Sequence, residues 1–322
     1  MSARPARPAA LRICDLCNAP QTAKRQLRRC AGCNATKYCG KKCQKADWPR
    51  HKLFCRINGS VWGERALTAI VQSSSFPSFT AYFEGIKDFI DTHAWALNAI
   101  ARVSVTLQAG GTDWFMKPPK ALIITLLPYD PQAVAVPWET RRTPTFKVKR
   151  HDFVVISDEL PGLLGTAEEW HRHAPIRAEQ DEMLRSAAPD RYVGVLPVCF
   201  RVEGIEHVDV IRQYPRYRRP SHVPEPVVGD LDKIRLIRDA FLLFAGSINS
   251  YFPLRADPAN SQVGVPGRMV RNRGARSWQA LFTNWREYRR GTHGGLDEVL
   301  DSLRTKLRPD VLMDIALASE CI

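Results

Sequence analysis

Seven cysteines and one histidine near the N-terminus form four closely spaced pairs. The pairs are Cys14 and Cys17, Cys30 and Cys33, Cys39 and Cys43, and His51 and Cys55. Two residues separate the members of the first two pairs, and three residues separate those of the last two. Structural zinc sites hold four thiolate or imidazole ligands in a tetrahedron. Eight such ligands therefore predict two bound Zn²⁺ ions.

A disulfide framework is the alternative, because small cysteine-dense segments of secreted proteins usually have one. Three features oppose it. Residues 1–12 contain no apolar core of a secretory signal. The cluster has an odd number of cysteines, and its eighth member is His51, which can ligate a metal but cannot form a disulfide. Zinc is the better interpretation.

The spacing within each pair predicts how the pair is held. Two intervening residues let both sulfurs meet across a tight turn, and Gly32 eases that turn in the second pair. Positions i and i+4 lie on one face of a helix. We therefore expect Cys39 with Cys43, and His51 with Cys55, on helices. Spacing alone does not decide which pairs share an ion.

The pattern C-x2-C, C-x2-C, C-x3-C, H-x3-C closely resembles the MYND zinc finger over about 42 residues. Tyr38, Gln44 and Trp48 also match residues that flank the ligands in that family. The resemblance implies a cross-braced arrangement of ligands. It places Cys14, Cys17, Cys39 and Cys43 on one zinc, and Cys30, Cys33, His51 and Cys55 on the other.

The same resemblance implies a function in protein interaction. Several MYND fingers dock short proline-containing peptides of the Pro-x-Leu-x-Pro kind in a shallow groove, and Gln44 and Trp48 match the groove positions. An indole offers a proline ring a flat apolar surface together with an N–H donor. Packing inside a finger poor in apolar residues explains Trp48 equally well. The predicted partners are proteins that carry such proline-containing motifs.

The charge distribution raises a second function class. Residues 1–60 contain 14 lysines and arginines against two aspartates, so +12 of the net charge of +14 lies there. Seven thiolates and two Zn²⁺ ions would lower that charge to +9. A basic surface of this kind attracts the phosphates of nucleic acid, although similar cations also surround anionic zinc–thiolate centres. Nucleic-acid binding is the alternative function.

An enzyme is the third class, because MYND fingers also occur within SET-type lysine methyltransferases. In those chains part of the catalytic fold, including a Gly-x-Gly turn, precedes the finger, whereas 13 residues precede Cys14 here. The Asn-His-Ser-Cys motif of that family is also missing, since the nearest match, residues 247–250, lacks the histidine and the cysteine. We therefore expect no methyltransferase activity and no catalytic residues.

Beyond residue 56 the sequence predicts a larger α+β domain. Residues 79–107, 166–188, 231–251, 275–290, 296–307 and 310–317 are expected to be helical. Residues 121–127, 145–156, 192–202 and 207–211 are expected to be strands, and 215–226 and 253–276 to be surface loops. Strands grouped between helices predict a mostly antiparallel sheet followed by C-terminal helices. The stripe from Trp278 to Tyr288 is expected to pack into the core.

These observations predict three segments: a flexible basic arm at 1–12, the two-zinc finger at 13–56, and an α+β domain at 57–322 whose function the sequence does not indicate. The longest aliphatic run, 121–127, is far shorter than a membrane-spanning helix. We therefore expect an intracellular protein, nuclear or cytoplasmic, without a membrane partner.

Overall fold

A computed structural model gives the arrangement of the chain. The residues that it describes are 14–17, 19, 21–32, 36–58, 79–108, 113–128, 146–156, 174–205, 209–218, 230–272 and 275–318. The predicted arm at 1–12 and Cys33 lie outside these residues, and so does the segment 59–78 that follows the predicted end of the finger at residue 56. The boundaries of the three segments therefore remain predictions.

The N-terminal unit has a two-stranded antiparallel sheet and one helix. Strands β1 (Arg28–Arg29) and β2 (Lys37–Tyr38) pair with Arg28 opposite Tyr38, and α1 spans Lys41–Asn58. Its buried cluster consists of Cys14, Cys30, Tyr38 and Cys55. Three of these four residues are predicted metal ligands, so among its described side chains the unit has little apolar core apart from the predicted metal sites.

The larger unit is built on a four-stranded mixed sheet with the strand order β4-β3-β5-β6. Its strands are β3 (Lys120–Pro128), β4 (Phe146–Val155), β5 (Tyr192–Val202) and β6 (Asp209–Tyr217). The β3–β4 and β5–β6 pairs are antiparallel, whereas β3 and β5 pair in parallel from Leu122 opposite Val198 to Leu126 opposite Val202. The α+β class with a mostly antiparallel sheet is confirmed.

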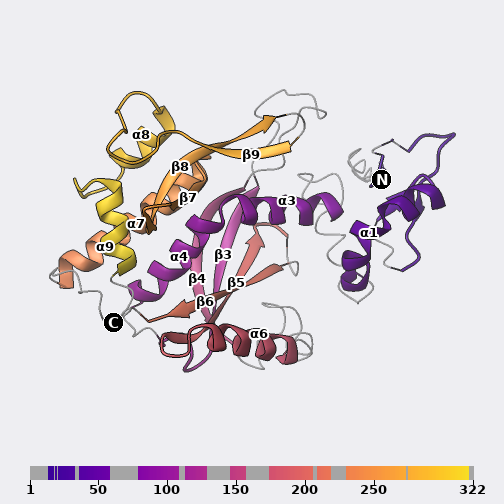
Figure 1. The fold of residues 1–322 in the computed structure, drawn as a ribbon. Coiled ribbons are helices and arrows are strands. Elements are labelled where there is room, and N and C mark those ends of the chain that lie inside the picture. The colour runs from indigo at the N-terminus through magenta and orange to yellow at the C-terminus, as the bar shows by residue number, and fades with distance from the viewer. Residues whose placement is uncertain are drawn as a thin grey trace, which may run out of the picture.

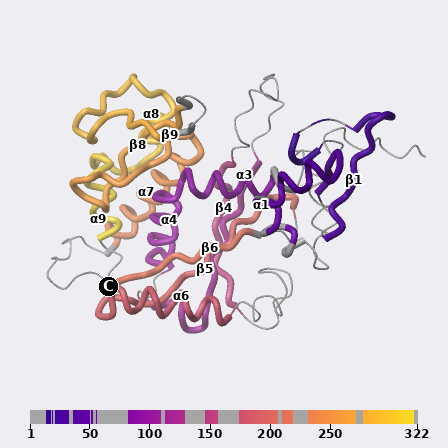
Figure 2. Tube along the Cα trace, turned by 45° about the vertical axis from the view of Figure 1, so that its right-hand side comes forward, coloured from indigo at the N-terminus to yellow at the C-terminus, as the bar shows by residue number. Residues whose placement is uncertain are grey.

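Helices cover both faces of this sheet. They are α3 (Phe79–Thr92), α4 (Ala94–Leu107), α6 (Ala174–Ala187) and α7 (Asp230–Asn249). The face with Leu122, Ile124 and Phe200 forms the main core with α3, α4 and α7. In Figures 1 and 2, β5 and β6 lie between α4 and α6, so α6 covers the opposite face. Alternation of side chains along each strand supplies apolar residues to both faces.

A second, three-stranded antiparallel sheet follows α7 in the chain. It contains β7 (Leu254–Asp257), β8 (Asn260–Asn272) and β9 (Ala275–Ala280), and the chain continues into helices α8 (Gly294–Asp301) and α9 (Pro309–Ala318). Strand β7 contacts α4, and β8 contacts α9. Figure 1 shows these orange and yellow elements gathered at one end of the molecule. The predicted C-terminal helices are confirmed, and α8 ends earlier than expected.

Two sequence predictions in this region are wrong. Residues 253–276 form β7 and β8 rather than a surface loop, and 275–290 begin with β9 and continue in turns rather than a helix. The aromatic stripe indicated a helix because its residues recur every three or four positions, as on one face of a helix. A strand followed by tight turns can give the same intervals. Its packing role is correct: Trp285 is buried, and its Nε1 donates a hydrogen bond to the Gly264 carbonyl at 2.8 Å.

Two smaller differences have local causes. The expected helix over 79–107 is divided into α3 and α4 at His93, which is buried against Phe89. Strand β6 runs to Tyr217 instead of ending at Ile211, because it pairs along β5 as far as Tyr192. Of the expected helix at 166–188, residues 174–187 form α6, and residues 166–173 lie outside the described part of the chain.

Candidate metal centre and partner surface

The structure brings Cys14, Cys17, Cys39 and Cys43 together. Their sulfur atoms all lie within 4.8 Å of one another, and the Cys17 and Cys39 sulfurs are 3.5 Å apart. A tetrahedral zinc ion with Zn–S distances of about 2.3 Å would place its sulfur ligands ~3.8 Å apart. The spacing of these four sulfurs therefore fits one zinc ion.

A second cluster contains Cys30, His51 and Cys55. The Cys30 and Cys55 sulfurs are 3.7 Å apart, and His51 Nε2 lies 3.4 Å from the Cys30 sulfur. The fourth predicted ligand, Cys33, lies outside the described residues. The first cluster thus combines the first and third ligand pairs along the sequence. The second cluster combines Cys30 of the second pair with both members of the fourth pair. This alternation is the cross-braced order that the resemblance implied. Within the part of the chain that the structure describes, only these two groups bring three or more possible metal ligands together.

Secondary structure positions these ligands. Helix α1 carries Cys43, His51 and Cys55, but it begins at Lys41, so Cys39 precedes it in a bend after β2. The expectation that Cys39 and Cys43 are both on a helix is thus wrong. Cys39 is instead held by its own backbone N–H, which donates a hydrogen bond to the Cys14 sulfur at 3.4 Å.

Gly32 has a role that differs from the one expected. A Cβ atom at this position would lie 2.7 Å from the Cys55 sulfur, which is closer than nonbonded atoms approach. The glycine therefore makes room for a ligand from α1 beside the turn that follows Cys30, and any side chain at residue 32 would displace Cys55.

Buried hydrogen bonds connect β2 to α1 between the two clusters. The Tyr38 hydroxyl donates to Asp47 Oδ2 at 2.7 Å, and both side chains are almost fully buried. Burial, followed by the bond to Asp47, raises the pKa of Tyr38. Thr36 Oγ1 lies 3.3 Å from His51 Nε2. Sequence reasoning missed Asp47, although it is the only acidic residue of α1.

The first cluster needs a cation to hold four thiolates. Burial opposes ionisation of Cys14, but hydrogen bonds from the backbone N–H groups of Cys17, Cys39 and Leu16 outweigh it and lower the pKa of Cys14 to about 7. Burial and the neighbouring thiols raise the pKa of Cys39 to about 12, and they also raise that of Cys43. The Cys14 thiolate is thus favoured, whereas burial and the neighbouring thiols oppose ionisation of Cys39 and Cys43, a conflict that a divalent metal removes.

The two predicted peptide-contact residues differ in their surroundings. Trp48 is 46% exposed, and its ring centroid lies 6.0 Å from that of His51. Gln44 is half-buried, and its Nε2 donates a hydrogen bond to the Cys30 sulfur at 3.5 Å. Residues 44, 48, 51 and 55 follow the spacing of one helical face. The indole is therefore open to a partner directly beside the second cluster, and Gln44 contacts that cluster itself.

Comparisons with known proteins agree with this geometry. Residues 14–55 match the family model of the MYND finger. The chain is 42% identical over 67 residues to SET domain and MYND-type zinc finger protein 6 of Schizosaccharomyces pombe, a match that covers 21% of this chain and 11% of that protein. It is 46% identical over 44 residues to human histone-lysine N-methyltransferase SMYD3, which covers 14% of this chain and 10% of that protein.

A third relative is F-box protein At1g67340 of Arabidopsis thaliana, 44% identical over 48 residues, or 14% of this chain and 13% of that protein. The chain thus matches only about a tenth of the length of these relatives. No solved structure is significantly similar to the chain. None of the described helices is both long and apolar enough to cross a lipid bilayer. Residues 14–55, with their two clusters of metal-ligating side chains, are a MYND-type zinc finger.

Proposed function

We propose that this protein is an adaptor whose finger, loaded with two Zn²⁺ ions, docks short proline-containing peptides of partner proteins on the α1 face that carries Trp48. The observation that carries the proposal is the exposed indole beside the second cluster. Tyr38, by contrast, is almost fully buried. An exposed tryptophan on a small rigid unit is the kind of residue that dominates binding energy in protein interfaces.

The zinc ions and Gln44 prepare this face for a partner. Cys14, Cys17, Cys39 and Cys43 would hold one ion, and Cys30, Cys33, His51 and Cys55 the other. With the Gln44 Nε2 directed at the Cys30 sulfur, the carbonyl oxygen of the same amide would accept a hydrogen bond from the peptide backbone. The Trp48 ring would pack against a proline. Cysteine side chains stay reduced, and so able to bind zinc, in a reducing compartment, which supports a nuclear or cytoplasmic location.

The test is a titration of the full-length, zinc-loaded protein into a fluorescently labelled Pro-x-Leu-x-Pro peptide, followed by anisotropy. We expect saturable binding that Trp48→Ala weakens about 30-fold, the ratio that corresponds to a 2 kcal/mol contact. Gln44→Ala should weaken binding less. Leu16→Ala, which truncates another exposed apolar side chain of the finger, should leave the affinity unchanged. Equal affinities for the Trp48→Ala and parent proteins would refute the proposal.

Salt dependence separates this function from nucleic-acid binding. The finger exposes Lys24, Arg25, Arg28, Arg29, Lys41, Lys42, Lys45 and Lys52. Phosphate contacts through such residues lose affinity steeply as salt rises, whereas a contact centred on an indole does not. Peptide affinity should change little between 50 and 200 mM NaCl, on the order of twofold, whereas an oligonucleotide should lose ~10³-fold or more if it engages six or more of these cations.

A further inference from the structure

Helix α1 carries a row of lysines beside the exposed indole. Positions 41, 45, 48 and 52 follow the spacing of one helical face, and all four side chains there are exposed: Lys41, Lys45, Trp48 and Lys52. We call the three lysines of this face the lysine row. By the same spacing, Gln44 and His51 lie on the other side of the indole, toward the second cluster. Trp48 therefore lies between a metal site and a line of exposed cations.

The finger does not neutralise the lysine row itself. Residues 1–60 contain two acidic side chains, Asp15 and Asp47. Asp47 is buried and accepts a hydrogen bond from the Tyr38 hydroxyl, and Asp15 accepts one from the backbone N–H of Lys37 at 2.6 Å. Both carboxylates are thus used inside the finger. In the described part of the chain, the three ammonium groups of the row form neither a hydrogen bond nor an ion pair, so they do not contact the described thiols of the clusters.

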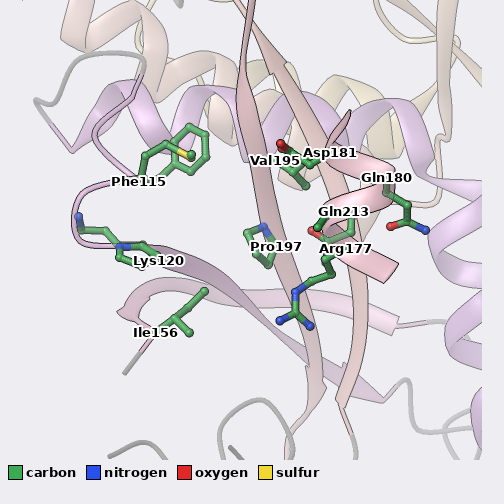
Figure 3. A pocket seen from close by; sticks show the side chains of 12 residues that line it. Phe115, Lys120, Ile156, Arg177, Gln180, Asp181, Val195, Pro197 and Gln213 are labelled. Carbon is green, nitrogen blue, oxygen red and sulfur yellow. The ribbon is translucent and has the colours of Figure 1, made fainter. Parts of the chain in front are cut away.

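A lysine of the larger unit shows the contrast. A cavity of about 320 Å³ lies between α6 and the sheet, and Figure 3 shows Lys120 among the side chains that line it. The Lys120 ammonium donates hydrogen bonds to the carbonyl oxygens of Trp114 and Pro118, at 2.8 and 3.0 Å, and lies 4.3 Å from the centroid of the Trp114 ring. Lys120 is therefore part of the fold, whereas the lysine row of α1 is open to a partner.

Repulsion within the row favours an anionic partner. Lys41 and Lys45 are four residues apart, a spacing at which like charges on a helix destabilise each other. Lys45 precedes Trp48 and Lys52 follows it along the same face, so a peptide that covers the indole passes close to both lysines. An acidic side chain on that peptide would reduce the repulsion and accept a charge-assisted hydrogen bond from an ammonium group.

We propose that the lysine row selects partner peptides in which acidic residues flank the proline motif. This inference rests on the peptide function proposed for the finger and specifies the partner more closely. Along the helix axis, Lys41 lies ~10 Å before Trp48 and Lys52 lies ~6 Å after it, since a helix rises about 1.5 Å per residue. An extended proline-containing peptide advances about 3.1 Å per residue. Acidic residues two or three positions from the proline on Trp48 would therefore reach the row from a peptide that runs along α1.

The test compares three labelled peptides on the full-length, zinc-loaded protein by fluorescence anisotropy. All three contain the same Pro-x-Leu-x-Pro core, and the residues on both sides of it are glutamate, glutamine or lysine. In about 50 mM NaCl the glutamate-flanked peptide should bind about fivefold more tightly than the glutamine-flanked one, a ratio that corresponds to ~1 kcal/mol. The lysine-flanked peptide should bind more weakly than both. In about 200 mM NaCl the preference should fall to about twofold, because salt screens exposed charges.

Two triple variants locate the preference. The row variant combines Lys41→Gln, Lys45→Gln and Lys52→Gln. The control variant removes three exposed cations of the finger that lie off this face, through Lys24→Gln, Arg25→Gln and Lys42→Gln. Glutamine has nearly the helix propensity of lysine, so α1 should be retained, and an unchanged affinity for the glutamine-flanked peptide reports a folded finger. The row variant should bind the glutamate-flanked and glutamine-flanked peptides equally, whereas the control variant should keep the preference of about fivefold.

The outcomes separate this inference from the function on which it rests. If no peptide binds the parent protein, both are refuted. If all three peptides bind equally, or if the row variant keeps the preference for glutamate, only the inference about acidic flanks is wrong. A glutamate-flanked peptide with alanines in place of the core prolines and leucine should not bind, and binding as tight as that of the intact peptide would contradict both. A single-stranded oligonucleotide that outcompetes the acidic peptide and loses affinity only in the row variant would assign the row to nucleic acid instead.

Discussion

The finger and the sheet-based unit are stabilised by different kinds of interaction. Among the described residues of the finger, the buried apolar cluster consists of Cys14, Cys30, Tyr38 and Cys55, and its three cysteines are also metal-ligand candidates. The core around the four-stranded sheet is made of aliphatic and aromatic side chains from α3, α4, α7 and the strands. One unit therefore depends on coordination bonds and the other on the burial of apolar surface. Metal removal and core truncation should consequently affect different parts of the same chain.

The largest expected effect is the loss of metal. Treatment with a strong chelator should unfold residues 14–55, because metal binding supplies about 10–16 kcal/mol to structural zinc units of this kind. Amide hydrogen exchange, read by mass spectrometry, should show full exchange in α1 and unchanged protection in α4 and β5. Protected amides in α1 after metal removal would contradict the contrast between the two units.

The converse experiment truncates the apolar core. Phe200 of β5 is fully buried, and Phe200→Ala should destabilise the larger unit by about 3–5 kcal/mol because a cavity remains where the ring was. Urea unfolding followed by tryptophan fluorescence measures this loss, since seven of the eight tryptophans lie outside the finger. The zinc content of the folded variant should stay at two ions per chain. Ile176→Ala, at an exposed position of α6, is the control and should change little.

A hydrogen bond inside the finger should have a smaller effect. Tyr38→Phe leaves the buried Asp47 carboxylate without its hydroxyl donor, at a cost of about 1–3 kcal/mol. Because folding of the finger and metal binding are coupled, the loss should appear as weaker zinc affinity in competition with a chromophoric chelator. Tyr288→Phe removes a tyrosine–aspartate bond in the larger unit, to Asp297, and should leave zinc affinity unchanged. An equal effect of both variants on zinc affinity would show that the two units are not independent.

The smallest effect concerns pH. Burial, together with the charge of Arg255, lowers the pKa of His93 to about 3. The unfolded chain then binds more protons than the folded chain below about pH 6.5, so stability falls as pH falls from there toward 3. At pH 5 the loss should reach up to ~2 kcal/mol relative to pH 7. His93→Asn should reduce this difference in urea unfolding of the larger unit, and an unchanged pH dependence would exclude His93 as its origin.

The sequence predicted the finger far better than the rest of the chain. Ligand types and spacing are local properties, so four pairs of ligands sufficed to indicate two metal sites, and the MYND resemblance supplied the order of pairing. Strand β5 was predicted with its observed bounds, because valine and aromatic residues are frequent in it and Asp190 and Gly204 flank it. The segment 275–290 was mispredicted because the position of Trp278 depends on its partner strand, with Met269 opposite it. No local pattern carries that information.

The sequence by itself determined the chemistry of the finger: which side chains could hold metal, how many ions they could hold, and where the basic charge lies. Only the tertiary structure decided that Cys39 precedes the helix, that Gln44 contacts the second cluster, and that Trp48 stays open to solvent. The physical reason is that ligand types and short spacings are written in neighbouring residues. Exposure and the meeting of distant segments depend on how the whole chain packs.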